Sequence, residues 1–224
     1  MDAQANGNRL VEQLDRLVGC WHLLQHPFYQ AWTAGTLERG ALQLYAAQYY
    51  RHVEAFPGYL QELAARADDG LRPVVEENLA EELSSRRTHP ELWRDFAAAV
   101  GTSQRELDNS APLPGTRALV ETFRRLCREG SPVEAVAALY VYEAQVPEIA
   151  AKKIEGLRRF YGVNEPKGLA YFAVHEEADV RHRAAWRGWL AAQPEAENRP
   201  ALAAAESALR VLWGALDGVT PQCA

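Results

Sequence analysis

The 224-residue sequence predicts an all-α fold, with residues 1–224 forming a single domain. We expect a bundle of about seven to nine helices. Apolar residues recur at the helical spacing of three and four positions along nearly the whole chain. No segment alternates between apolar and polar residues as half-buried strands do. Serine, proline and glycine stand where helices would begin and end, which divides the periodic pattern into separate elements.

The N-terminal half begins with an amphipathic helix whose apolar face carries Leu10, Leu14, Leu17 and Trp21. A short aromatic stretch follows at 26–32, and a long helical pattern continues from 37 to 60. Another helix is expected from 71 to about 86. Because the residue before a proline disfavours the α conformation, Pro90 predicts that this helix ends before His89 and that a new one starts near Pro90.

The C-terminal half carries two Ser-x-x-Glu capping boxes, at 103–106 and 131–134, each of which predicts a helix start. Gly101, Gly130 and Gly162 follow periodic segments and predict helix ends. After the short helix at 103, these signals predict further helices at 115–129, 131–161, 164–192 and 202–216.

Composition excludes several classes of function. A net charge of −6 without a basic stripe argues against nucleic-acid binding. No apolar run approaches the roughly 20 residues that span a bilayer, so no membrane association is expected. The first residues lack the basic and apolar regions of a signal peptide. Three widely separated cysteines, none in a Cys-x-x-Cys motif, favour a reduced cytoplasmic location without a thiolate metal site.

His175, Asp179 and His182 form the most informative pattern in the chain. Their spacing of four and then three residues places all three side chains on one face of a helix. The chain has only six histidines, so two of them beside an aspartate on one face are unlikely to occur by chance. Imidazole and carboxylate are ligands of first-row transition metals, so this face predicts half of a metal site.

Other helices must supply the remaining ligands, and the candidates are Glu82, His89 and Glu143. Spacing alone does not separate Glu82 from its neighbour Glu81, and a solvated acidic face remains the alternative. Glu143 ends an uncharged apolar run and precedes Pro147 by four residues, so a bent or opened helix is expected there. Such a buried glutamate needs a metal or a basic partner. Together the candidates give three histidines and three carboxylates, enough for two metal ions.

The chain has only three lysines, and two of them, Lys152 and Lys153, stand together. One interpretation is a solvated helix face. The other is that an amine is needed there, since lysine can act as a deprotonated nucleophile or nitrogen donor and arginine cannot. The sequence does not separate Lys152 from Lys153.

The chain resembles the family of the Chlamydia protein associating with death domains, which belongs to the haem-oxygenase-like di-metal oxidases and is related in fold to the TenA and PqqC proteins. The longest shared motif is Tyr171-Phe-x-x-His-Glu-Glu-Ala-Asp-Val-Arg-His182. Shorter ones lie at 26–29, 55–57, 78–82, 137–140 and 142–147. The resemblance implies a haem-oxygenase-like helical bundle and favours Glu82 over Glu81. The metal ligands that it implies are Glu82, His89, Glu143, His175, Asp179 and His182.

The family supports p-aminobenzoate formation for folate biosynthesis, and its members are proposed to consume themselves. By resemblance, Tyr29 provides the aromatic ring and Lys153 the amine. Tyr45, Tyr142 and Tyr171 are further candidates, either for radical relay or for core packing. The expected cofactors are two metal ions, Fe/Fe or Mn/Fe, because oxygen and nitrogen ligands suit these metals. O2 and an external reductant are the expected partners, and a homodimer is an assembly to be tested.

Three alternatives follow from the same observations. The chain could be a multiple-turnover di-iron oxygenase that acts on an external amine, amino acid or fatty acid. It could be a metal-free binding or hydrolytic protein like TenA or PqqC. It could be a death-domain interaction protein, although nothing in the sequence indicates a surface for such a partner.

Overall fold

The computed structural model describes residues 2–83 and 86–220, and every regular element in these ranges is helical. Two 3-10 helices, η1 (Leu23–Gln25) and η2 (Glu195–Glu197), join longer elements. The α-helices are α1 (Asp2–Cys20), α2 (Pro27–Ala34), α3 (Arg39–Ala64), α4 (Arg72–Glu82), α5 (His89–Val100), α6 (Gln104–Asn109), α7 (Pro114–Glu129), α8 (Pro132–Glu143), α9 (Val146–Phe160), α10 (Pro166–Leu190) and α11 (Asn198–Asp217).

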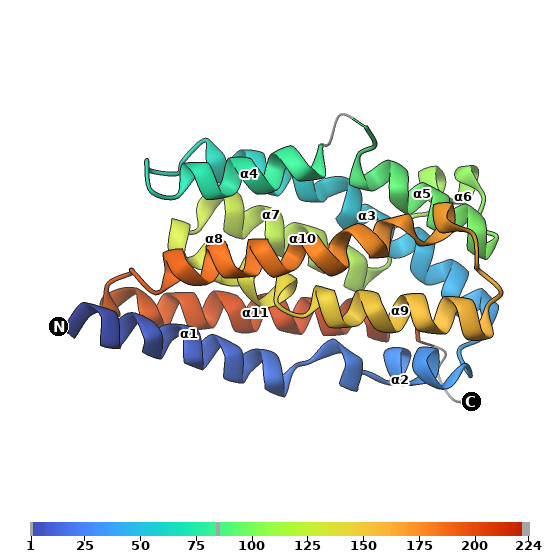
Figure 1. Ribbon diagram of the computed structural model, residues 1–224, viewed down its shortest axis with the longest axis horizontal. Helices are drawn as coiled ribbons and strands as arrows, with labels where there is room; N and C mark the ends of the chain where they lie inside the picture. The colour runs from blue at the N-terminus through green and yellow to red at the C-terminus, as the bar shows by residue number, and fades with distance from the viewer. Residues whose placement is uncertain (1, 84–85, 221–224) are drawn as a thin grey trace.

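The helices form an elongated bundle in which most axes run along the long dimension (Figure 1). In the view of Figure 1, α4 and α5 lie along the upper edge, and α1 and α2 lie along the lower edge. Helix α10 crosses the middle and packs against α4, α5, α8 and α9. Because α10 touches helices on both sides of the bundle, residues on its inner face can meet side chains from several elements.

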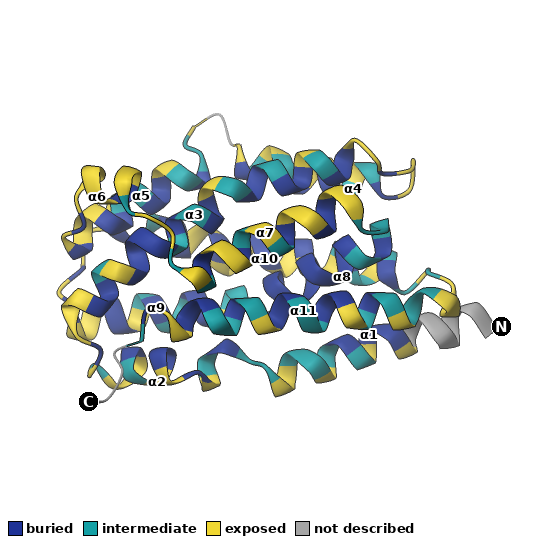
Figure 2. Cartoon of the chain, turned by 180° about the vertical axis from the view of Figure 1, so that it is seen from behind, coloured by how far each residue is buried: buried dark blue, intermediate teal, exposed yellow. Residues whose placement is uncertain are grey.

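Helix α8 is the centre of the bundle. Every residue from Ala135 to Glu143 is buried, and the helix packs mainly against α7, α10 and α11. Figure 2 shows α8 largely in the colour of buried residues, whereas α1 and α11 alternate between buried and exposed positions. A helix that is apolar on all sides is stable only when it is enclosed. The uncharged run before Glu143 therefore reflects full enclosure.

The segment expected to form one helix from 131 to 161 is divided in two. Helix α8 ends at Glu143 and α9 begins at Val146, because Pro147 has no N–H to donate to the Glu143 carbonyl. The Gln145 side chain stabilises the break: its Nε2 donates to the Val141 carbonyl at 2.8 Å, and its Oε1 accepts from the Leu23 amide at 2.8 Å. The opened turn that the sequence predicted is thus present as a complete interruption.

The aromatic stretch at 26–32 is also helical, as α2, where the sequence suggested no regular element. His26 caps α2, since its Nδ1 accepts from the Phe28 amide at 3.0 Å. Helix α2 packs against α9 at Gly156, where a Cβ atom would lie only 2.6 Å from the Trp32 ring. These two additional elements explain why the described residues contain eleven α-helices rather than seven to nine.

Candidate metal centre

Helix α10 presents His175, Asp179 and His182 to the interior. All three are at most 5% exposed, so the face of α10 that they share is buried. The two residues that follow His175, Glu176 and Glu177, are exposed. This contrast is expected because consecutive residues on a helix point in different directions.

Glu82 and His89 meet this face from the junction between α4 and α5. Glu82 is the last residue of α4 and His89 the first of α5, as Pro90 predicted. A capping box between Thr88 and Glu91 fixes the start of α5, so that His89 turns inward and is only 5% exposed. This third capping box was not among the two predicted from the sequence.

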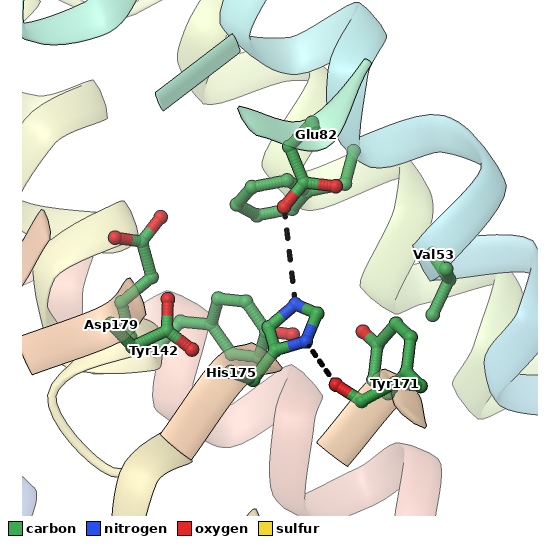
Figure 3. A pocket seen from close by; sticks show the side chains of 8 residues that line it. Val53, Glu82, Tyr142, Tyr171, His175 and Asp179 are labelled. Carbon is green, nitrogen blue, oxygen red and sulfur yellow. Dashed lines mark hydrogen bonds and ion pairs between the residues drawn. The ribbon is translucent and has the colours of Figure 1, made fainter. Parts of the chain in front are cut away.

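One triad of possible ligands consists of Glu82, His89 and His175, with one atom from each within 4.8 Å of the others. His89 Nδ1 lies 2.8 Å from Glu82 Oε1, and His175 Nε2 lies 4.0 Å from the same oxygen. His175 Nδ1 donates to the Tyr171 carbonyl at 2.6 Å, as Figure 3 shows. That bond leaves the lone pair on Nε2, which faces Glu82 and is free to bind a metal.

The second triad consists of Glu143, Asp179 and His182. His182 Nδ1 lies 3.4 Å from Asp179 Oδ1 and 3.9 Å from Glu143 Oε2. Glu143 is held from behind, since it accepts from Asn78 Nδ2 at 2.9 Å and from Trp186 Nε1 at 2.7 Å. Trp186 was missed, although it lies four residues after His182 and therefore on the same face of α10.

Glu81 and Glu82 occupy different surroundings. The Glu81 side chain is 27% exposed, and the Arg181 guanidinium binds both of its oxygens, at 2.8 and 3.1 Å. Glu82 is 5% exposed and belongs to the first triad. Glu81 nevertheless remains close to the centre, because its Oε2 lies 3.3 Å from His182 Nε2.

The electrostatics of the two triads favour the binding of cations. Burial, and next the charge of Asp179, raises the pKa of Glu143 to about 8. Burial, and next Glu82, raises the pKa of Asp179 well above its ordinary value, whereas burial lowers the pKa of His175 well below its own. Asp179 Oδ2 is buried without a hydrogen-bond partner. Unpartnered buried lone pairs and mutually repelling carboxylates are stabilised by a bound cation.

A second cluster, the tyrosine–lysine cluster, consists of Tyr29 from α2, Tyr45 from α3 and Lys153 from α9. The hydroxyls of Tyr29 and Tyr45 lie 3.3 Å apart, and Lys153 Nζ donates to the Tyr45 hydroxyl at 2.6 Å. Burial lowers the pKa of Lys153 to about 7 and raises that of Tyr29. Lys152, in contrast, is 44% exposed and pairs with Glu155 at 3.0 Å. The buried lysine of the pair is therefore Lys153.

A small cavity of about 20 Å³ joins the two clusters. Its lining includes Tyr29 and Lys153 from the tyrosine–lysine cluster as well as Tyr142, Tyr171 and His175. Tyr142 and Tyr171 also line the space around the metal-ligand candidates, together with Glu82, Glu143, His175 and Asp179 (Figure 3). The structure thus brings all eleven predicted site residues into one continuous region. It adds Tyr49, which lines the same cavity and was not among the candidates.

None of the described helices combines the length and the apolar composition that crossing a membrane requires.

The fold is that of known haem-oxygenase-like proteins. A TenA homologue from Pseudomonas syringae superposes with a TM-score of 0.83 at 18% identity, over 98% of this chain and 95% of the homologue. This similarity concerns the fold alone.

Sequence comparisons are more specific. The chain is 41% identical to a 4-aminobenzoate synthase of Chlamydia pneumoniae, over 92% of each protein. It is 40% identical to a 4-aminobenzoate synthase of Nitrosomonas europaea, over 95% of this chain and 91% of that protein. The family described as "Iron-containing redox enzyme" matches residues 43–213. The chain therefore belongs to the haem-oxygenase-like family of iron-containing redox enzymes.

Proposed function

We propose that this protein uses O2 at a two-metal centre to form p-aminobenzoate for folate biosynthesis, from its own Tyr29 and with nitrogen from Lys153. The names of relatives about 40% identical support the product. The observation that carries the internal source is the position of Lys153. Its buried amine shares the Tyr45 hydroxyl with Tyr29, and both border a cavity that reaches His175.

The chemistry of the product explains why these groups must meet. A tyrosine side chain has a CH2 group opposite its phenol oxygen, whereas p-aminobenzoate has a carboxyl group opposite an amine. Conversion therefore requires cleavage of the Cα–Cβ bond, oxidation of Cβ and replacement of the phenol oxygen by nitrogen. Two reduced metals, Fe/Fe or Mn/Fe, would supply the electrons that activate O2 for such an oxidation. We propose as their ligands Glu82, His89, Glu143, His175, Asp179 and His182.

The protein's own residues prepare the amine. Five aromatic rings surround Lys153 Nζ at 5.0 to 5.8 Å: Tyr29, Tyr45, Tyr49, Trp93 and Phe172. Because burial lowers the Lys153 pKa to about 7, a large fraction of the amine is neutral and nucleophilic near pH 7. The Tyr45 hydroxyl holds that nitrogen beside the Tyr29 ring, and the aromatic shell excludes water from reactive intermediates.

The test uses protein produced with ring-labelled tyrosine, loaded with metal anaerobically and then exposed to O2. Wild-type protein should yield labelled p-aminobenzoate, at no more than about one equivalent per chain on this single-use proposal. Tyr29→Phe and Lys153→Arg should abolish the product and keep the metals, because the first removes the phenol and the second the transferable amine. Lys152→Arg is the matched control and should leave the yield unchanged. Unlabelled product, or product in many-fold excess over protein, would instead establish an external substrate.

The partners that we propose are O2 and an external reductant. We propose the cytoplasm as the location, and the two described cysteines, Cys20 and Cys127, are both free thiols, as a reducing compartment requires. A homodimer stays a prediction. Light scattering on protein eluting from a gel-filtration column would test it by measuring the molar mass.

A further inference from the structure

Tyr49 lies between the metal-ligand candidates and the tyrosine–lysine cluster. Its hydroxyl donates to the Tyr142 hydroxyl at 3.0 Å, and Tyr142 borders the same space as Glu143, His175 and Asp179. On its other side, the Tyr49 ring lies 5.3 Å from the Tyr45 ring with an interplanar angle of 30°. Tyr49 therefore touches one member of each group.

Trp93 also bridges this space, but it has no hydrogen bond to a phenol on either side. The Trp93 ring lies 4.8 Å from Tyr171 and 5.7 Å from Tyr45, so it also spans the two sides. Its indole N–H, however, donates to the Ala46 carbonyl at 2.8 Å, away from both phenols. Trp93 could pass an electron but has no hydrogen bond through which to pass a proton. Oxidation of a phenol at ordinary potentials must release its proton along with the electron, and Tyr49 has the hydrogen bond that this release requires.

We infer that Tyr49 carries the oxidising equivalent from Tyr142 to Tyr45, and so connects the metal centre to the residues that form the product. This inference rests on the proposed function, in which O2 activated at the metal centre is the oxidant. Tyr142 first gives one electron and its phenolic proton to the O2 that would be reduced at the metal centre. The Tyr49 O–H bond then breaks and an O–H bond on Tyr142 forms across the 3.0 Å contact, which restores Tyr142 and leaves the radical on Tyr49.

In the next step, Tyr45 reduces the Tyr49 radical. One electron passes from Tyr45 to Tyr49 through the ring contact. When Lys153 is neutral, its nitrogen lone pair can accept the Tyr45 O–H across the same 2.6 Å contact, and the phenolic proton of Tyr45 passes to it. The products are a Tyr45 radical, a Tyr49 phenolate and a Lys153 ammonium. The two charges attract each other, since Lys153 Nζ lies 5.5 Å from the centre of the Tyr49 ring. The radical then stands in hydrogen-bond contact with the Tyr29 hydroxyl.

A residue that is easier to oxidise than tyrosine traps a passing radical, which gives a direct test. Protein carrying Tyr49→3-aminotyrosine, loaded with metal and frozen shortly after mixing with O2, should show the aminotyrosyl radical by electron paramagnetic resonance. Its p-aminobenzoate yield should fall at least ten-fold. Tyr59→3-aminotyrosine is the matched control, because Tyr59 is a fully buried tyrosine of the same helix whose hydroxyl donates to the Val120 carbonyl. It should show no such radical and keep the wild-type yield.

Tyr49→Phe completes the test, because phenylalanine keeps the ring and removes only the hydroxyl. Its metal content and helical circular dichroism should match those of the wild type, while product formation falls at least ten-fold. The inference is overturned if the aminotyrosine at position 49 remains unoxidised while wild-type protein makes product. It is also overturned if Tyr49→Phe keeps its yield or loses its metals. If wild-type protein makes no labelled product but the position-49 trap is oxidised, the proposed function fails and the electron route stands.

Discussion

Replacing Lys153 by methionine should stabilise the protein near neutral pH, by an amount that decreases as the pH rises. Burial lowers the pKa of Lys153 from 10.5 to about 7, so the folded chain binds this proton less tightly than the unfolded chain does. Each tenfold change in proton affinity corresponds to about 1.4 kcal/mol. At pH 7 the buried amine therefore costs on the order of 4 kcal/mol, and methionine fills a similar volume without this cost.

The sign follows from proton binding. Between pH 7 and 10.5 the unfolded state binds more protons at this site than the folded state, so wild-type stability rises with pH. The advantage of Lys153→Met should fall by about 1 kcal/mol for each pH unit, to about 2 kcal/mol at pH 9, because the folded-state amine still titrates near pH 7. Loss of the hydrogen bond to Tyr45 reduces it by about 1 kcal/mol throughout.

Urea unfolding of both proteins from pH 7 to 9, in buffer containing a chelator, measures this difference without a contribution from metal binding. Lys152→Met is the control, and its stability should stay close to that of the wild type because the Lys152 side chain is 44% exposed. A stability difference between wild type and Lys153→Met that does not change with pH would refute the reasoning, since it would show that Lys153 keeps an ordinary proton affinity when folded.

Three further predictions concern the metal centre. His175→Ala and His182→Ala should each lower the amount of bound metal measured by elemental analysis. The control is His22→Ala, which should keep its metal because His22 pairs with Glu148 outside the site. Full metal occupancy in both site variants would contradict the ligand set. Chelation should increase hydrogen exchange in α4 and α10 more than in α7, because the carboxylates then repel one another, and equal exchange in all three helices would argue against a shared site. Trp186→Phe removes the indole N–H that binds Glu143 and should weaken metal affinity about 10- to 100-fold in competition with a chelating dye; an unchanged affinity would show that this hydrogen bond does not orient the ligand.

The sequence predicted the helical fold well because its signals are local. Capping boxes at Ser103 and Ser131 and the glycine at 101 act within a few residues, and the structure has helix boundaries at each of them. The break after Glu143 was underestimated for the opposite reason. Pro147 removes one hydrogen bond, but a complete interruption also needs the Gln145 side chain and the distant Leu23 amide, which only the tertiary structure brings together.

The site residues were predictable where a single helix contains the whole pattern. They were less predictable where two adjacent residues of the same type could each be the one that points into the site. The spacing of His175, Asp179 and His182 defines a face without reference to other elements. Adjacent residues such as Lys152 and Lys153 point about 100° apart on a helix, and sequence does not tell which direction is inward. Tyr49 escaped notice because an aromatic residue in a long apolar pattern is indistinguishable from core. Trp186 could have been found by continuing the α10 face for one more turn.

The burial of Tyr29 has a consequence for the life of the molecule. The side chain is 3% exposed and lies against Phe28 and Trp32, with ring centres 5.3 and 6.3 Å away. If this ring leaves as product, the chain that remains has a hole in its interior, and deleting a large buried aromatic side chain typically costs about 3–5 kcal/mol. That is a large part of the roughly 5–15 kcal/mol that keeps a domain folded. A used copy would thus unfold more readily than a fresh one, and proteases that capture unfolded chains would remove it first.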